Sequence, residues 1–337
     1  MIVRFKLLFI GFVFSLKSSW AQETVRTVDF NRHHVLSLDL GISPAPFNIR
    51  YPFTEEVDIL RYKNNFKPIL GIAYAHRWVN FRLAFPVMSA FRNKARYGTT
   101  EHFSLGFDYA FQHLYSDFDF RMNVGYALKD AVLFDTTLNN EYPNALIPTL
   151  GSVNLSANLW YFNHKDFQMN ALQGKRAHFI GEVRTWYLKG TINFFGISNG
   201  VDPLIPQMLH DLENSKTKSS AFSSLDFGMI PGYAYANRFK NWQFSGWMGL
   251  GPVIQTKFFT LSDKLGGFIG LAPRYDIRFV GGYSTEKYFL FFTAHFDNKS
   301  IYFQKLGYNQ YFYTLRIMVG TRIAPKKGAA SIHQKPR

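Results

Sequence analysis

The sequence predicts an all-β fold, namely a transmembrane, antiparallel, up-and-down β-barrel of about 12 strands, within a range of about 10 to 14. Three observations predict it. Apolar and polar residues alternate strictly along many segments, an export signal precedes a chain without cysteine, and the connections between segments alternate between short and long. Short periplasmic turns and long extracellular loops are typical of outer-membrane barrels.

The clearest alternation runs from His102 to Gln112, where large apolar residues alternate with small, polar or charged ones. Successive side chains of a strand face opposite ways, so a period of two sorts them onto two surfaces. A soluble sandwich packs its apolar surface against a second sheet, whereas a membrane barrel turns it toward lipid. The residues expected to face lipid are Phe103, Leu105, Phe107, Tyr109 and Phe111.

The same alternation recurs along the chain, in segments of about the 9–11 residues that cross a bilayer when tilted. The further expected strands are 35–42, 67–76, 79–88, 118–127, 153–161, 177–188, 221–236, 241–257, 266–280, 287–297 and 311–320. Two weaker segments, 166–172 and 190–197, raise the count from 12 to 14 if both are strands. Trp78, Trp160, Trp186 and Trp242 lie near expected strand ends, where an aromatic girdle would be.

The connections follow the rhythm of a barrel. The short ones are expected at 76–78, 113–115, 163–165, 237–241 and 281–286. The long ones are expected at 43–66, 89–100, 127–150, 198–220, 258–265 and 298–309. If the amino terminus starts in the periplasm, every short turn falls on the periplasmic side, and so does the end of the last strand.

The chain divides into a signal peptide at 1–21, one barrel domain at 22–323 and a basic, disordered tail at 324–337. Leu7 to Phe14 is apolar and follows two basic residues, and Ser19-Trp20-Ala21 is a small-x-small cleavage site. The alternative is a membrane anchor, but this core has about half of the roughly 20 residues that a spanning helix needs. We therefore expect export and an outer-membrane location.

The composition limits the partners. The chain has no cysteine, so it has no lipoprotein anchor, and its 38 Lys and Arg against 23 Asp and Glu give a net charge of +15. The basic residues are scattered, which fits either solubilising loop charge or an anionic partner. The expected partners are outer-membrane lipid, lipopolysaccharide, the barrel-assembly machinery and anionic or polar small solutes. We expect no nucleic acid.

Several strand motifs resemble a known family. They are Pro231 to Tyr235, Lys240 to Trp242, Gly71 to Tyr74, Phe81 to Phe85 and Phe103 to Tyr109. Together they are similar to an uncharacterised Bacteroidota outer-membrane β-barrel family, a domain of unknown function (4421-like). The likeness covers most of residues 30–323 and implies an outer-membrane barrel without a known activity. The basic tail departs from the usual barrel ending.

Charged residues at inward positions are the candidate site. The expected lumen-lining residues are Arg82, Asp108, Asp119, Arg121, Glu182, Arg184, Arg274, Asp276, Arg278 and Arg316. Charges are costly on a lipid face at mid-bilayer, which agrees with an inward placement. They either pair into a rigid network that fills the barrel, or line a pore whose arginine excess favours anionic or polar solutes.

No catalytic motif, metal cluster or cofactor site is expected. The sequence therefore predicts an outer-membrane barrel with a passive role, as a porin-like or transporter-like channel or a structural envelope protein. One alternative is a membrane-embedded enzyme acting on lipid or lipopolysaccharide, with His102 beside Ser104 as its candidate pair. Another alternative is a secreted, soluble β-sandwich that binds carbohydrate.

Overall fold

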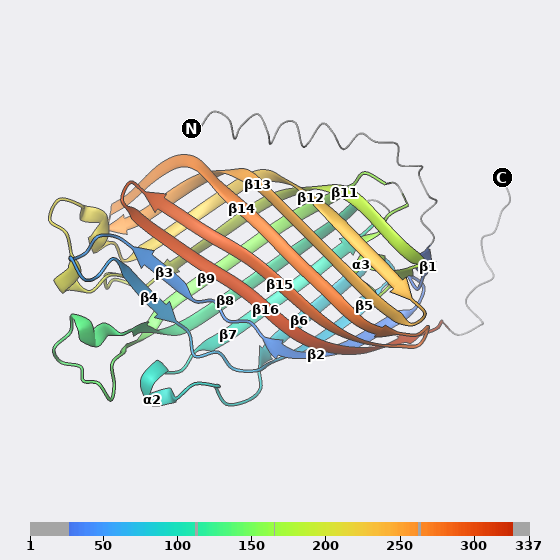
Figure 1. The fold of residues 1–337 in the computed structure, drawn as a ribbon, viewed down its shortest axis with the longest axis horizontal. Coiled ribbons are helices and arrows are strands. Elements are labelled where there is room, and N and C mark those ends of the chain that lie inside the picture. Colours follow the sequence, from blue (N-terminus) through green and yellow to red (C-terminus); the bar gives the residue numbers. More distant parts are fainter. Residues whose placement is uncertain (1–26, 112–113, 165, 262–263, 326–337) are drawn as a thin grey trace.

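A computed structural model describes residues 27–111, 114–164, 166–261 and 264–325 (Figure 1). The expected signal peptide at 1–21 lies outside the described residues, and so does the basic tail beyond residue 325. Helices in the described part of the chain are short: none has the length and apolar composition needed to span a membrane.

Twelve strands of the described chain close into one antiparallel ring (Figure 1). They are β2 (His34–Ile42), β5 (Ile69–His76), β6 (Val79–Pro86), β7 (Glu101–Ala110), β8 (Leu114–Lys129), β9 (Ala145–Phe162), β11 (Gly181–Ser198), β12 (Ala221–Phe239), β13 (Trp242–Leu261), β14 (Lys264–Ser284), β15 (Tyr288–Phe303) and β16 (Leu306–Ile323). Each pairs with its neighbours in this order, and β16 pairs with β2 to close the ring. The predicted barrel is confirmed, and the sandwich alternative is wrong.

The alternation sorts side chains as predicted. On β2, Leu36, Leu38 and Leu40 are exposed, whereas Ser37 and Asp39 between them are buried inside the ring. The same two faces appear on β7, where Phe103 is exposed and Ser104 and Asp108 are buried. The apolar surface therefore faces out, and the polar surface lines the lumen.

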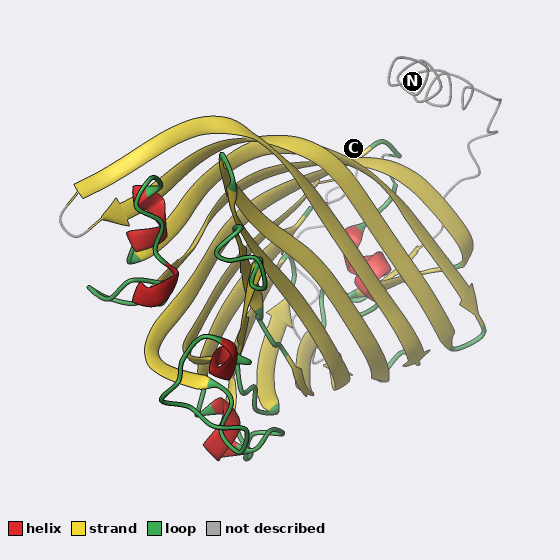
Figure 2. Ribbon diagram, turned by 60° about the vertical axis from the view of Figure 1, so that its left-hand side comes forward, coloured by secondary structure: helices red, strands yellow, loops and turns green. Residues whose placement is uncertain are grey.

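The two ends of the barrel differ. We call the end with the tight turns at Arg77 and Lys240 the turn end, and the end with loops 87–100, 130–144 and 199–220 the loop end. Both Arg77 and Lys240 have a positive φ of 54°. The loops carry α2 (Lys94–Tyr97) and the 3₁₀ turns η1 (Ala131–Leu133), η2 (Gln207–Leu209) and η3 (Ser215–Lys218), which Figure 2 draws in red.

Residues 43–66, expected as a long loop, instead extend the wall. β3 (Phe47–Arg50) continues β2 along β16 in the same register, and β4 (Ile59–Lys63) returns to pair with β8. These strands have only four and five residues, too few for a recognisable alternation. Buried Asn65 joins the hairpin to its surroundings, because its side chain donates to the carbonyls of Arg92 and Gly98.

The connection between β9 and β11 is a plug inside the barrel. Residues 163–180 contain α3 (Met169–Gln173) and β10 (Ala177–Phe179), and β10 pairs with β1 (Thr27–Asp29). The prediction of a short turn at 163–165 and a strand at 166–172 is therefore wrong. In 166–172 the apolar residues Phe167, Met169 and Ala171 alternate with polar ones, but a segment this short can form a helix turn as well as a strand. Gly174 ends α3 in the left-handed conformation, with φ at 73°.

Other strand boundaries also differ from those expected from the sequence. Segments 177–188 and 190–197 were expected as separate strands, but residues 181–198 form the single strand β11. The expected loops 258–265 and 298–309 are mostly strand, and β15 turns directly into β16 between Phe303 and Leu306. These strands extend well beyond the length that crosses a bilayer, which explains why their outer parts resemble loops in composition.

Two apolar clusters occupy the lumen. The turn-end core lies where the plug meets the wall, and includes Phe162, Phe167, Leu172, Phe179, Phe289 and Phe291. The loop-end core lies inside the opposite end, and includes Phe47, Tyr62, Tyr126, Phe195, Phe222 and Tyr308. The members named here are at most 1 % exposed, except Phe289 at 3 %. The polar part of the lumen therefore lies between two apolar clusters.

Candidate functional site

A belt of charged side chains fills the middle of the barrel. It comprises Asp39, Arg82, Asp108, Asp117, Asp119, Arg121, Lys175, Arg176, Lys189, Asp226, Arg274, Asp276, Arg278, Asp297, Lys299 and Arg316. They come from strands all around the ring and from the plug. Buried charges in proteins are normally paired, so the pairing pattern shows which of them have a structural role.

On one side of the belt, Arg82 holds Asp39 in a bidentate pair with distances of 2.8 and 2.7 Å. A Cβ at Gly71 would lie 2.4 Å from the Asp39 carboxylate and 2.5 Å from the Arg82 guanidinium. A Cβ at Gly41 would lie 2.5 Å from Cγ of Arg316. Glycine at these two strand positions therefore lets the charged side chains lie flat against the wall.

Asp276 is the most connected acid of the belt. It accepts from Lys189 and from Arg278, whose Nε lies 3.0 Å away, and His295 approaches at 3.4 Å. Arg278 also reaches Asp117 at 3.3 Å. Trp160 lies inside the barrel, and its ring stacks beneath the cations of Lys189 and Arg278 at 4.8 and 5.2 Å. These contacts join side chains of five strands, β8, β9, β11, β14 and β15, across the lumen.

Simpler pairs complete the belt. Arg121 pairs with Asp119 at 2.6 Å, and Lys299 pairs with Asp297 at 2.9 Å. Arg274 pairs with Asp226 at 2.6 Å and also donates to the Ser300 carbonyl. That contact replaces strand pairing, because the β14–β15 ladder ends at Asp276 and Asp297. Most of the belt is thus the paired network that was one of the two interpretations of the sequence.

The plug is held by buried polar contacts. Arg176 of the plug pairs with Asp108 of the wall, and both side chains are at least nine-tenths buried. Arg322 of β16 donates to the carbonyls of Gly174 and Lys175 at 2.6 and 2.7 Å. Gln243 of β13 donates to a carbonyl of α3 at 2.8 Å. The plug is therefore a folded part of the barrel interior.

The loop end is closed by contacts between loops and wall. Tyr62 of β4 donates to the carbonyl of Leu204 in loop 199–220, and Tyr51 donates to the Asp211 carboxylate of the same loop. The hydrogen bond from Tyr51 and the backbone N–H of Glu213 lower the pKa of Asp211 below its ordinary value. The loop thus lies over the loop-end core, and the ionised form of Asp211 is favoured there.

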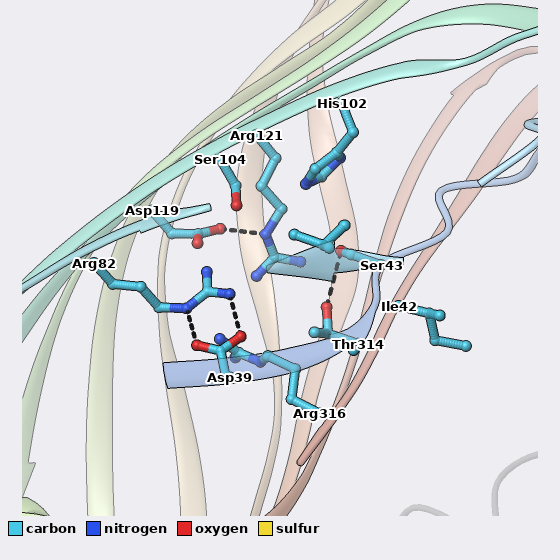
Figure 3. Close-up of a pocket in the computed structure, with 12 residues that line it drawn as sticks. Asp39, Ile42, Ser43, Arg82, His102, Ser104, Asp119, Arg121, Thr314 and Arg316 are labelled. Atoms are coloured by element: carbon cyan, nitrogen blue, oxygen red, sulfur yellow. Dashed lines mark hydrogen bonds and ion pairs between the residues drawn. The ribbon is translucent and has the colours of Figure 1, made fainter. Parts of the chain in front are cut away.

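A chamber remains between the paired charges. Three adjoining cavities of about 30, 100 and 150 Å³ share the lining residues Arg82 and Arg316. Figure 3 shows the smallest, where Arg82, Arg121 and Arg316 converge opposite Asp39 and Asp119. The two larger cavities reach the plug at Gln173 and Lys175. Cavities of this size and polarity hold small polar groups or several waters.

Two cations of the chamber do not take part in the paired network. Within the described residues, the side chains of Arg316 and Lys175 make no hydrogen bond and no ion pair. The Nε of Arg316 is buried and has no hydrogen-bond partner. Both side chains line the 100 Å³ and 150 Å³ cavities. The chamber therefore holds more positive than negative charge.

Eight of the ten predicted lumen residues lie inside the barrel: Arg82, Asp108, Asp119, Arg121, Arg274, Asp276, Arg278 and Arg316. Glu182 and Arg184 do not, because both are exposed on the outer face of β11 with Trp186 and Leu188. Near the membrane edge an outward charge costs little, so charge alone does not identify the inner face there. Trp160 was also misplaced, since it is buried inside, whereas Trp78, Trp186 and Trp242 are exposed near the turn end.

Several belt residues were not predicted from the sequence. Asp117 and Lys189 lie in phase with inward neighbours, such as Tyr187 and Thr191 around Lys189. That phase was the available signal, and the division of β11 into two segments hid it. Lys175 and Arg176 had no signal, because nothing in the sequence places a loop inside the barrel.

The described residues give limited support to catalysis. They contain no group of His, Asp and Glu that could hold a metal ion. His102 lies inside the barrel, where its Nδ1 is 2.8 Å from the Asn123 amide oxygen. Ser104 has no hydrogen bond to His102 in this part of the chain. The pair proposed from the sequence is therefore not assembled as a nucleophile and base.

The chain matches one family model and is similar to several solved structures. A family model described as a domain of unknown function (DUF4421) matches residues 43–322. The search of curated proteins found no match. Similar solved structures include the outer membrane protease OmpT from Escherichia coli, with 10% identity, a TM-score of 0.40, and coverage of 89% of this chain and 99% of that chain. The toluene transporter TodX from P. putida has 8% identity and a TM-score of 0.30, with coverage of 87% and 90%.

Proposed function

The chain belongs to the DUF4421 family, whose function is unknown, and we propose that it is a closed, transporter-like barrel of the outer membrane for small polar or anionic solutes. In this proposal the turn end faces the periplasm and the loop end faces outward. The solute enters the chamber only when the plug or loop 199–220 moves aside. The role is passive, because nothing among the described residues suggests an energy source or a chemical step.

One observation supports this proposal above a purely structural role: the charged belt is not packed solid. A structural barrel gains stability from a lumen filled to native density with every charge paired. Here the belt retains a cavity of about 150 Å³ and two cations without a carboxylate partner. Arginine-lined lumens favour anionic solutes.

Membrane placement has its own test. The chain has no cysteine, so single-cysteine variants give a clean background. We expect Phe107→Cys to react with a bilayer-dissolved maleimide in the purified, reconstituted protein, and Ser104→Cys to be protected. Equal reaction at both positions, or a protein recovered only in the soluble periplasmic fraction, would contradict an outward lipid face.

Solute passage is tested by flux into proteoliposomes. A variant in which residues 164–179 and loop 199–220 are each replaced by a Gly-Ser turn removes the closures at both ends, and its folding is checked by heat-modifiable gel mobility. We expect this variant to pass small anions faster than cations of equal size, and the full chain to pass both slowly. A folded variant that passes cations faster, or nothing at all, would refute the proposal.

A further inference from the structure

The two cations of the chamber that have no ion-pair partner among the described residues indicate a binding site for an anion. Arg316 and Lys175 line the same cavities, one from the wall and one from the plug. A buried cation without a counter-charge is strongly unfavourable, and proteins normally supply a partner for it. No carboxylate of the described residues forms an ion pair with either group. A bound anion would supply the missing charge.

The geometry favours an oxyanion. The wall presents Arg316 beside Arg82 and Arg121 in the smallest cavity, and the carboxylates there each pair with one of the latter two. The planar N–H donors of a guanidinium match the oxygens of phosphate, sulfate or carboxylate groups better than they match a spherical ion. The buried Nε of Arg316 is such a donor without an acceptor.

The wall is shaped around this arrangement. Gly41 lies beside Arg316, and Gly71 lies beside the Asp39–Arg82 pair. A Cβ at either glycine would approach these side chains within 2.6 Å, so the arginines keep their positions only because both residues lack one. Asp39 is held in two hydrogen bonds by Arg82, which leaves it bound to that partner rather than to Arg316.

We propose that the chamber is a binding site for one small oxyanion, held by Arg316 of the wall and Lys175 of the plug. This inference rests on the proposed function and names its ligand class. The site spans the wall and the plug, so occupancy stabilises the closed barrel. Anion binding would therefore stabilise the docked plug, and the docked plug would increase the affinity for the anion.

The test is equilibrium binding of inorganic phosphate to the full-length barrel, refolded in detergent with and without phosphate so that entry into the closed chamber does not limit the result. Isothermal titration calorimetry and the thermal unfolding midpoint are the two readouts. We expect saturable binding in the wild type, weakened at least about tenfold in Arg316→Gln and in Lys175→Gln. The matched control is Arg184→Gln, an arginine on the outer face of β11.

A second readout separates binding from folding. We expect Arg316→Met to raise the unfolding midpoint in phosphate-free buffer, because it removes an uncompensated charge, and to abolish the further rise that phosphate gives the wild type. The proposal is overturned if the wild type binds no phosphate, if chloride at equal ionic strength binds as well, or if Arg316→Gln and Arg184→Gln behave alike. Phosphate binding to the full chain, without anion flux through the variant that lacks both the plug and loop 199–220, would refute transport and leave the site intact.

Discussion

Arg322 anchors the plug, so its removal tests how the barrel is closed. The guanidinium lies between the rings of Phe30 and Phe289, at 4.3 and 4.9 Å from their centroids. It donates to the carbonyls of Gly174 and Lys175 in the plug, and to groups of the β14–β15 turn. The perturbation is Arg322→Ala, which removes the plug contacts and leaves the wall strands in place.

The magnitude follows from the two hydrogen bonds into the plug. A hydrogen bond to a charged group contributes about 1.5–3 kcal/mol, so the pair contributes about 3 kcal/mol at the lower end. This corresponds to a shift of roughly 150-fold in the equilibrium between a docked and an undocked plug. Arg322→Lys keeps the charge but loses the forked donors, so we expect a smaller shift of about tenfold.

The assay is the labelling rate of a single cysteine at Ala171, which is fully buried in α3. When docking is fast, a water-soluble maleimide reacts in proportion to the undocked population. We expect Arg322→Ala to raise this rate roughly 150-fold, with the folded band intact on heat-modifiable gels. A cysteine at Ala131, which is buried in the loop-end core away from the plug, is the control and should not change. A rise below about threefold at residue 171, or equal rises at both positions, would refute the reasoning.

Three further predictions concern the belt, the orientation of β9 and the loop end. Asp276→Asn leaves Lys189 and Arg278 without their shared acid, so we expect urea unfolding to show a loss of about 3–5 kcal/mol of stability. The outward control Glu182→Gln should lose about 0.5 kcal/mol or less, and similar losses in both variants would contradict a structural role of the charged belt. Trp160→Ala should cost about 3–5 kcal/mol because that ring is buried under two cations, whereas exposed Trp186→Ala should cost about 1 kcal/mol or less, and the reverse order would show that the faces are misassigned. The lowered pKa of Asp211 means that its contribution to loop order is present above the ordinary carboxyl pKa and is lost as pH falls through the lower folded value. Tyr51→Phe brings the pKa of Asp211 back toward its ordinary value. As pH is lowered, the faster hydrogen exchange that reports loss of order in 199–220 should therefore begin at a higher pH than in the wild type. Identical pH profiles would argue against the hydrogen bond.

The wall of the barrel could be predicted from the sequence because its signal is local. A lipid face needs an apolar residue at every second position, and this requirement repeats in each strand, as in Leu36, Leu38 and Leu40. The alternation no longer identifies the outer face near the strand ends, where the side chains do not need to be apolar. Glu182 and Arg184 lie near the turn end of β11, where an outward charge costs little, and the phase was misassigned there.

The interior could be predicted only in part. Arg82 was placed inward, but its pairing with Asp39 depends on strand register, which no single strand encodes. The plug was missed because its burial depends on tertiary contacts. Phe167 and Leu172 lie in a short alternating segment that is compatible with either a strand or a helix turn, and burial in the lumen selects the helix turn.

The most direct test of the central claim is the current carried by the full-length protein in a planar bilayer. We propose that the plug and the two apolar cores close a cation-rich chamber within a transmembrane ring. We predict no steady current from the wild type, and a steady, anion-selective current when residues 164–179 and loop 199–220 are both replaced by short turns. A steady open-pore current from the folded wild-type barrel would contradict the account.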